Sequence, residues 1–256
     1  DAVEQVSREQ WRLYVERLAL AERYPGIQGV GFTQAIRPAE RAAHVARIRS
    51  QGFADYDIHP AGERELYTSI IFLEPFSGRN LAAFGYDMYA EPIRQQAMQR
   101  AAQLGETSIT GKVTLVQETH GTVQAGVLLY VPVYRPHLPT STPDERMQAL
   151  LGFVYSPYRV DDLMRGILRA ADLPLALHIY ASADEAPEHL LHASREAPAP
   201  GSARYSALQR LELYGQTWTL RMDSRPEFED RFHANEALVF GLGLGLSLLV
   251  FFLTSS

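Results

Sequence analysis

Hydrophobic and polar residues in the middle of the chain follow first a strand pattern and then a helix pattern. Residues 69–73 form a short apolar run that predicts a buried strand. After a polar turn, apolar side chains recur at helical spacing between Pro92, which suits the first helical position, and Gly105, which suits a helix end. The pattern therefore predicts a strand, a turn and a helix in this order.

Two further apolar runs predict a pair of strands after this helix. Residues 113–116 and 127–133 are rich in β-branched and apolar side chains, and Gly121 and Gly126 lie between them. A lone carboxylate, Asp87, stands among apolar residues just before the helix. We expect helix and sheet to enclose a cavity that has Asp87 at its rim.

The first 23 residues have the pattern of one amphipathic helix that starts without a capping residue. Its apolar stripe consists of Trp11, Tyr14, Val15, Leu18 and Ala21. Two interpretations stay open, because one apolar face can serve both. The stripe packs on its own domain, or it belongs to a long stalk helix that pairs with a second copy of the chain.

The other segments predict an α+β fold with a second, smaller unit after Pro157, where the composition changes. Predicted helices cover residues 37–51 and 160–171, and predicted strands cover residues 27–35, 150–155, 175–180, 205–214 and 216–222. The chain has no internal repeat at solenoid spacing.

The C-terminal residues 237–256 predict a transmembrane segment. Residues 237–253 contain no charged side chain, and a run of about 17 such residues is at the lower limit for crossing a bilayer. A buried core helix is the alternative, but Gly241, Gly243 and Gly245 would weaken a soluble helix and are tolerated in a membrane.

Composition and motifs exclude several classes of function. The net charge of −6 is spread without a basic stripe, which argues against nucleic-acid binding, and the absence of cysteine excludes disulfides and thiolate metal sites. The segment between Gly105 and Val113 fails the spacing of a phosphate-binding loop, and no nucleophile elbow occurs. His189 and His192 lack the glutamate of a zincin. We therefore expect no catalysis, no cofactor and no metal.

Asp87 itself has two interpretations. Its carboxylate can accept backbone N–H bonds near the helix start, where an anion is favoured by about 0.3–1 kcal/mol. Alternatively it anchors a ligand, because Phe84, Tyr86 and Met88 surround it with apolar surface and a buried carboxylate needs a donor. A ligand that presents N–H groups would supply that donor.

A series of short motifs resembles the CHASE domain, the extracytoplasmic sensor module of bacterial histidine kinases and nucleotide cyclases and of plant cytokinin receptors. The resemblance covers roughly residues 24–223. In chain order the motifs are Tyr24-Pro25-Gly26-Ile27, Tyr67, Leu73-Glu74-Pro75, Arg79-Asn80, Gly85-Tyr86-Asp87-Met88, Glu91-Pro92, Thr110-Gly111, Gln117-Glu118 and Tyr130-Val131-Pro132-Val133-Tyr134.

This resemblance implies an arrangement of domains. It predicts a stalk helix over residues 1–23, a membrane-distal PAS-like ligand-binding domain over residues 24–158 and a membrane-proximal PAS-like domain over residues 159–230. The chain would then return to the membrane. The full-length protein would carry a cytoplasmic output domain of the histidine kinase or diguanylate cyclase type.

The resemblance also implies a binding site. A carboxylate at the position of Asp87 accepts hydrogen bonds from adenine-type ligands in the plant receptors, and the backbone at Ile109 pairs with the same ligand. The expected ligand-binding residues are Tyr86, Asp87, Ile109, Thr119, Val131, Phe153 and Tyr155. The departure from the plant pattern is Tyr155, which stands where those receptors have small residues and would fill part of a cytokinin pocket.

These observations predict a periplasmic or extracellular sensor domain of an inner-membrane receptor. It would bind a small organic molecule, in the manner of adenine or a cytokinin, and dimerise with a second copy through the stalk. The alternatives are a membrane-anchored hydrolase, for which Glu74, Asp87, Glu91 and Glu118 offer carboxylates, and a dimerisation module without a ligand.

Overall fold

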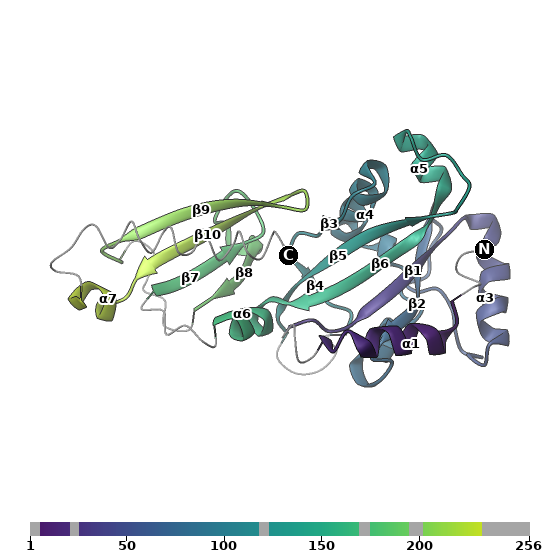
Figure 1. Ribbon diagram of the computed structural model, residues 1–256, viewed down its shortest axis with the longest axis horizontal. Helices are drawn as coiled ribbons and strands as arrows, with labels where there is room; N and C mark the ends of the chain where they lie inside the picture. The colour runs from purple at the N-terminus through teal and green to yellow at the C-terminus, as the bar shows by residue number, and fades with distance from the viewer. Residues whose placement is uncertain (1–5, 21–25, 118–122, 169–174, 195–201, 232–256) are drawn as a thin grey trace.

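The structure is a computed structural model that describes residues 6–20, 26–117, 123–168, 175–194 and 202–231. Two antiparallel sheets follow one another along the long axis of the molecule, and helix α6 (Val160–Leu168) lies between them (Figure 1). Both sheets are accompanied by helices, as expected for an α+β fold.

The first sheet has the strand order β2-β1-β6-β5-β3, and β4 pairs with β5. All these pairings are antiparallel, and β6 at the centre pairs with β1 on one side and β5 on the other. The strands are β1 (Val30–Ile36), β2 (Tyr67–Glu74), β3 (Ser108–Ile109), β4 (Val113–Thr114), β5 (Ala125–Tyr134) and β6 (Leu150–Arg159).

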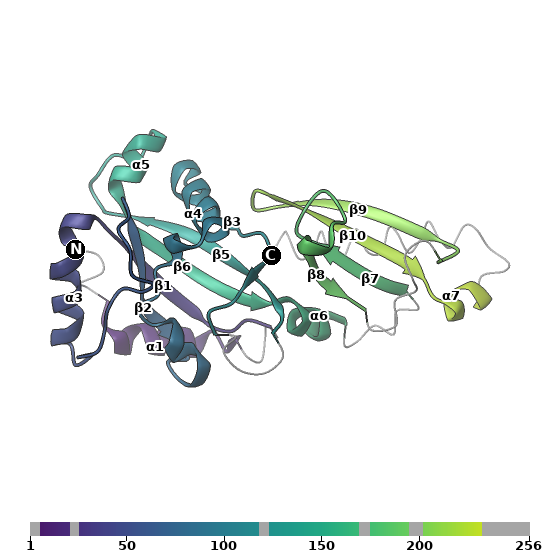
Figure 2. The same cartoon turned by 180° about the vertical axis from the view of Figure 1, so that it is seen from behind.

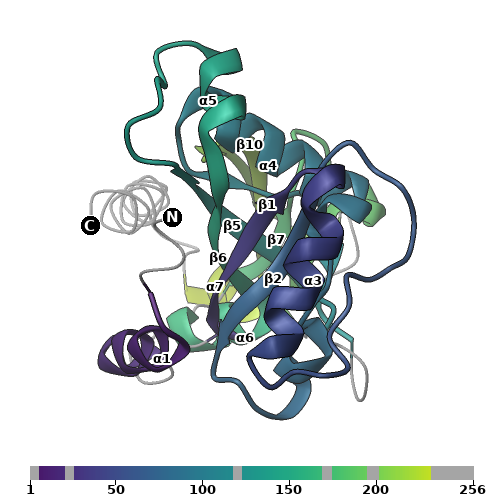
Figure 3. The same ribbon diagram turned by 90° about the vertical axis from the view of Figure 1, so that its right-hand side faces the viewer.

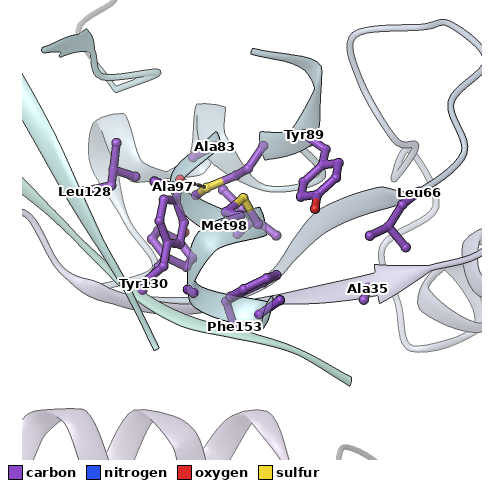
Figure 4. Packing of buried hydrophobic residues seen from close by; sticks show 14 of the residues in the cluster. Ala35, Leu66, Ala83, Tyr89, Ala97, Met98, Leu128, Tyr130 and Phe153 are labelled. Atoms are coloured by element: carbon purple, nitrogen blue, oxygen red, sulfur yellow. Dashed lines mark hydrogen bonds between the residues drawn. The ribbon is translucent and has the colours of Figure 1, made fainter. Parts of the chain in front are cut away.

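Helices and turns cover both faces of this sheet. On one face, α1 (Arg8–Arg17) and α3 (Arg41–Ser50) enclose a core that contains Phe32, Ile48 and Phe72. On the other face, α4 (Pro92–Leu104) encloses the core shown in Figure 4. Figure 3 looks along the long axis of the molecule, with α3 nearest the viewer and α1 at the lower left. The remaining elements of this part are η1 (Pro38–Glu40), η2 (Gly78–Ala83), η3 (Met88–Ala90) and α5 (Pro143–Ala149).

The second sheet has the order β8-β7-β10-β9 (Figure 2). Its elements are β7 (Leu175–Tyr180), η4 (Pro187–His189), β8 (Leu190–Ala193), β9 (Ser206–Leu213), β10 (Gln216–Ser224) and α7 (Pro226–Arg231). A third hydrophobic cluster joins the two sheets, because it combines Val127 of β5 and Val160 of α6 with Trp218 and Leu220 of β10. The two sheets therefore share buried apolar surface.

Local sequence signals place α4 correctly. The Glu91 side chain accepts hydrogen bonds from the backbone N–H groups of Ile93 at 3.1 Å and Arg94 at 3.0 Å, and Pro92 follows it. Gly105 ends the helix in the left-handed conformation with φ 74°, which costs glycine no steric penalty. The predicted strand 175–180 is also confirmed as β7, whereas the short strands β3 and β8 were not predicted.

The prediction of a long uncapped helix at the N-terminus is wrong for the described residues. Helix α1 has 10 residues, and Ser7 is the capping residue that precedes it and forms a capping box with Gln10. The ring of Trp11 stacks on Phe72 of β2 at 5.7 Å, and Val15 is buried. At these positions the stripe packs on its own domain, because the β2 face offers it apolar surface.

The predicted transmembrane segment, residues 237–256, lies outside the described residues. Within the parts of the chain that the structure describes, no helix combines the length and the apolar character needed to span a bilayer.

Candidate functional site

Asp87 lies in the interior, between β2 and η3, with 0% of its surface exposed. Its Oδ1 atom accepts hydrogen bonds from the backbone N–H groups of Thr68 at 2.8 Å and Tyr89 at 3.1 Å, and from the Thr68 hydroxyl at 3.3 Å. The bond from Tyr89 caps the short helix η3, while α4 is capped by Glu91. Asp87 therefore caps η3 through one of its two oxygens and does not cap α4, the helix whose start the sequence assigned to it.

The second oxygen of Asp87 has a different environment. Oδ2 is buried and accepts no hydrogen bond from the described residues, although Arg64 Nε lies 3.3 Å away. Burial raises the pKa of Asp87, and the hydrogen bonds from Thr68 and Tyr89 and the charge of Arg64 act in the opposite direction. Oδ2 is thus a buried acceptor that the protein leaves partly unsatisfied.

Arg64 links this carboxylate to the surface. Its side chain is 20% exposed and lines a pocket of about 920 Å³ together with Arg41, Glu63, Glu65 and Tyr67. The guanidinium group thus contacts Asp87 on one side and a solvent-accessible pocket on the other.

Aromatic side chains fill the space between the first sheet and α4. Tyr130 of β5 and Tyr155 of β6 are opposite each other across the strands, with ring centroids 6.4 Å apart, and Phe153 packs against Tyr130 at 6.0 Å. Figure 4 shows Met98 of α4 beside Tyr130 and Phe153. The Tyr155 ring lies over Gly31, where a Cβ atom would come within 2.5 Å of it.

Polar groups remain within this aromatic core. The hydroxyl of Tyr130 donates to Sδ of Met88 at 2.9 Å, which is a weak acceptor, and the hydroxyl of Tyr155 is buried without a partner among the described residues. Burial raises the pKa of both tyrosines. Both hydroxyls therefore stay protonated and can donate a hydrogen bond.

Sequence reasoning missed Arg94, which is 3% exposed on the buried face of α4. Its Nη1 donates to the hydroxyl of Tyr86 at 2.9 Å and its Nη2 to the carbonyl oxygen of Thr114 at 2.7 Å. The signal was available, since Arg94 shares its helix face with the apolar residues Ala97 and Ala101. We call Tyr86, Arg94, Tyr130 and Tyr155 the buried polar cluster.

The structure brings only part of the predicted site together. Phe153 and Tyr155 face α4, and Tyr86 joins the buried polar cluster through Arg94. Val131 is 41% exposed and lies on the opposite face of the sheet from Tyr130, its neighbour in the strand.

Two other predicted positions lie elsewhere. Ile109 belongs to the cluster between the sheets; its N–H donates to the carbonyl of Tyr214 at 3.1 Å and its carbonyl accepts from Arg100 at 3.1 Å. Its backbone is therefore occupied by protein partners. Thr119 lies outside the described residues.

The histidine pair of the second part has no metal-site geometry. His192 Nδ1 lies 2.7 Å from Oδ1 of Asp161, so that this histidine connects β8 with α6. Over the described ranges, no group of three or more His, Asp or Glu side chains is arranged to hold a metal ion.

Comparison with known proteins gives one family. The sequence matches the CHASE domain family over residues 4–192. No curated relative matches the chain. An extracellular ligand binding receptor from Desulfohalobium retbaense DSM5692 is similar with 12% identity over 83% of this chain and a TM-score of 0.45; the chain spans 32% of that receptor. The periplasmic sensory domain of the Campylobacter jejuni chemoreceptor Tlp1 is similar with 9% identity, 90% and 84% coverage of the two chains and a TM-score of 0.43.

Proposed function

The chain belongs to the CHASE domain family of extracytoplasmic sensor domains, and we propose that it binds a small organic ligand between the first sheet and α4, with Asp87 as a polar anchor. A CHASE domain is sensory and non-catalytic, so binding rather than turnover is the activity to explain.

The buried Oδ2 atom of Asp87 carries this proposal. A buried acceptor without a hydrogen bond costs about 1–3 kcal/mol, and a charged one costs more. A ligand with N–H groups would donate to Oδ2, and an adenine-type ring offers such groups. Arg64 would then move toward its solvent-accessible pocket, which already receives part of its side chain.

Ligand entry requires the core beside Asp87 to open. Met88 and Met98 are flexible thioethers that can repack more easily than branched side chains. Movement of the Tyr155 ring would act directly on β6, which continues without a break into α6. We therefore propose that ligand binding shifts α6 relative to the second sheet.

The proposal includes the surroundings of the domain. The transmembrane segment at residues 237–256 would hold it outside the membrane, and a kinase or cyclase domain would receive the signal. A homodimer would use the face of α1 that carries Leu13 and Tyr14, which are 42% and 60% exposed, since Trp11 packs on its own sheet.

The test measures binding of adenine, isopentenyladenine and small amines to the wild-type chain and to Asp87→Asn by calorimetry. Asparagine keeps an acceptor for the N–H groups of Thr68 and Tyr89 but removes the charge. Affinity should fall roughly tenfold to a hundredfold for any compound that binds through Asp87. The matched control is Asp55→Asn at an exposed site, which should change nothing. Equal affinity of Asp87→Asn for a bound compound would reject the anchor role.

One observation favours a second candidate, a structural module without a ligand. The aromatic core of Tyr130, Phe153 and Tyr155 is closed, with each side chain at most 1% exposed. A module of this kind would bind none of the compounds, and its melting temperature would not respond to them.

A further inference from the structure

We propose that the ligand also carries a carboxylate group, which binds to Arg94 together with the hydroxyls of Tyr86 and Tyr155. This inference rests on the proposed function, since it places the anion in the same space between the first sheet and α4. It concerns a different end of the ligand from the one at Asp87.

The charge of Arg94 is the first argument. The guanidinium is almost fully buried, and among the described residues it forms no ion pair with a carboxylate. Buried arginines are rarely found without a charged partner, because desolvation of the cation is expensive. Here the partners are a phenol and a backbone carbonyl, which are neutral.

The free donor of Arg94 is the second argument. Nε is buried and has no acceptor among the described residues, while Nη1 and Nη2 are each engaged. The guanidinium fork matches the two oxygens of a carboxylate, so an incoming carboxylate would accept from Nε and from one Nη. Tyr86 would remain beside the carboxylate, and its hydroxyl would donate a hydrogen bond to the anion.

The unpaired hydroxyl of Tyr155 lies in the same core. The Tyr155 ring centroid is 6.4 Å from that of Tyr130, and Tyr86, the partner of Arg94, packs against the same cluster. Burial raises the pKa of both Tyr130 and Tyr155, and the charge of Arg94 lowers it. Among the described residues, the Tyr155 hydroxyl has no acceptor and the Arg94 guanidinium has no carboxylate partner. One anionic group of a ligand would satisfy both.

The surroundings favour an organic carboxylate over phosphate. Among the described residues Arg94 is the only buried Arg or Lys, and the side chains packed in this core, such as Met88, Met98 and Phe153, are apolar. One cation compensates the single charge of a carboxylate, whereas phosphate would leave a further negative charge in an apolar site. The carbon skeleton of the ligand would replace part of the methionine packing.

The experiment compares carboxylates with neutral amides of the same shape. The probes are acetate with acetamide, benzoate with benzamide and phenylacetate with phenylacetamide, each titrated into the full chain by calorimetry. At least one carboxylate should bind about tenfold or more tightly than its amide, and this preference should vanish in Arg94→Gln. Arg94→Lys should keep part of the preference, because it keeps the charge but loses the fork.

Two further variants distinguish a loss of binding from a folding defect. Tyr155→Phe removes only an unpaired hydroxyl, so it should fold normally and weaken carboxylate binding several-fold. Arg100→Gln is the matched control on α4, since Arg100 binds Ser108 and Ile109 instead; it should leave the preference unchanged.

Several outcomes would overturn the inference. The inference fails if no carboxylate binds more tightly than its amide. It also fails if the preference for carboxylates persists in Arg94→Gln and Tyr155→Phe. If amides or adenine still bind in a manner that depends on Asp87, the proposed sensor function survives this failure. If no probe of any kind binds, both proposals fail.

Discussion

Arg64 Nε lies 3.3 Å from Oδ2 of Asp87, which makes a mostly buried cation the only charged neighbour of this carboxylate among the described residues. Oδ1 is bound to backbone N–H groups and serves the fold, whereas Oδ2 depends on one side chain that also faces a pocket. A single carboxylate can thus have a structural oxygen and an exchangeable one.

Asp87→Ala should lower the free energy of unfolding by about 3 kcal/mol. The variant leaves the Thr68 N–H without its acceptor and Arg64 without its partner, and such losses cost about 1–3 kcal/mol each when buried. The Tyr89 N–H keeps the Thr68 hydroxyl oxygen at 3.0 Å as its acceptor. Urea denaturation monitored by tryptophan fluorescence measures the change. The control is Glu91→Ala, which removes only the cap of α4 and should cost about 1 kcal/mol. Equal losses in the two variants would contradict the special position of Asp87.

Acid should destabilise the chain through His44. Burial, and then the charge of Arg47, lowers the pKa of His44 to about 3. The ring lies 2.8 Å from the Tyr56 hydroxyl and 3.1 Å from Arg47, so it is held neutral. Below a pH of about 6.5 the unfolded chain binds a proton at this histidine and the folded chain does not. The free energy of unfolding therefore decreases as the pH is lowered.

The magnitude should be about 1.4 kcal/mol for each pH unit below about 6.5. Other groups titrate in this range, so the measurement is the difference between wild type and His44→Gln at several pH values. The free energy of unfolding of wild type minus that of His44→Gln should decrease as pH falls from about 6.5 toward about 4, because only the wild type loses stability through this histidine. A difference that is constant with pH would show that His44 takes up its proton in the folded state as readily as in the unfolded one.

Gly31→Ala should destabilise the first sheet by about 1–3 kcal/mol through overpacking. The added Cβ would approach the Tyr155 ring at 2.5 Å and the Phe72 carbonyl oxygen at 2.6 Å, and the backbone oxygen cannot move away easily. Gly52→Ala is an informative comparison, because no atom lies within 4 Å there and the cost comes from its φ of 98° alone. Near-ultraviolet circular dichroism should also change in Gly31→Ala, as the Tyr155 ring moves.

Topology gives a prediction outside the described residues. If residues 237–256 cross the membrane and the sensor domain lies outside the cytoplasm, alkaline phosphatase inserted within residues 195–201 should be active in intact bacteria. Green fluorescent protein inserted at the same place should be dark after Sec-dependent export. The reverse pattern would place the domain in the cytoplasm.

Elements that depend on local chemistry are predictable from the chain alone. Helix α4 has its proline, its glutamate cap and its terminal glycine within the segment, and β7 is a run of apolar and aromatic residues interrupted only by His178. The ordered motifs around Tyr86 and Asp87 were also sufficient to identify the family, because such motifs follow from the chain alone.

Only the tertiary structure decided how these elements are used. The resemblance to the CHASE domain predicts Val131 at the site, but this residue lies on the other face of β5, and alternation along the strand does not show which face meets α4. The same limit applies to Trp11, which was free to pack on a second copy or on Phe72. Helical spacing places Arg94 on the face of Ala97 and Ala101, but only the structure shows that it pairs with Tyr86 and Thr114 and, among the described residues, with no carboxylate. Periodicity fixes which residues share a face, but burial and charge pairing depend on which distant segment covers that face.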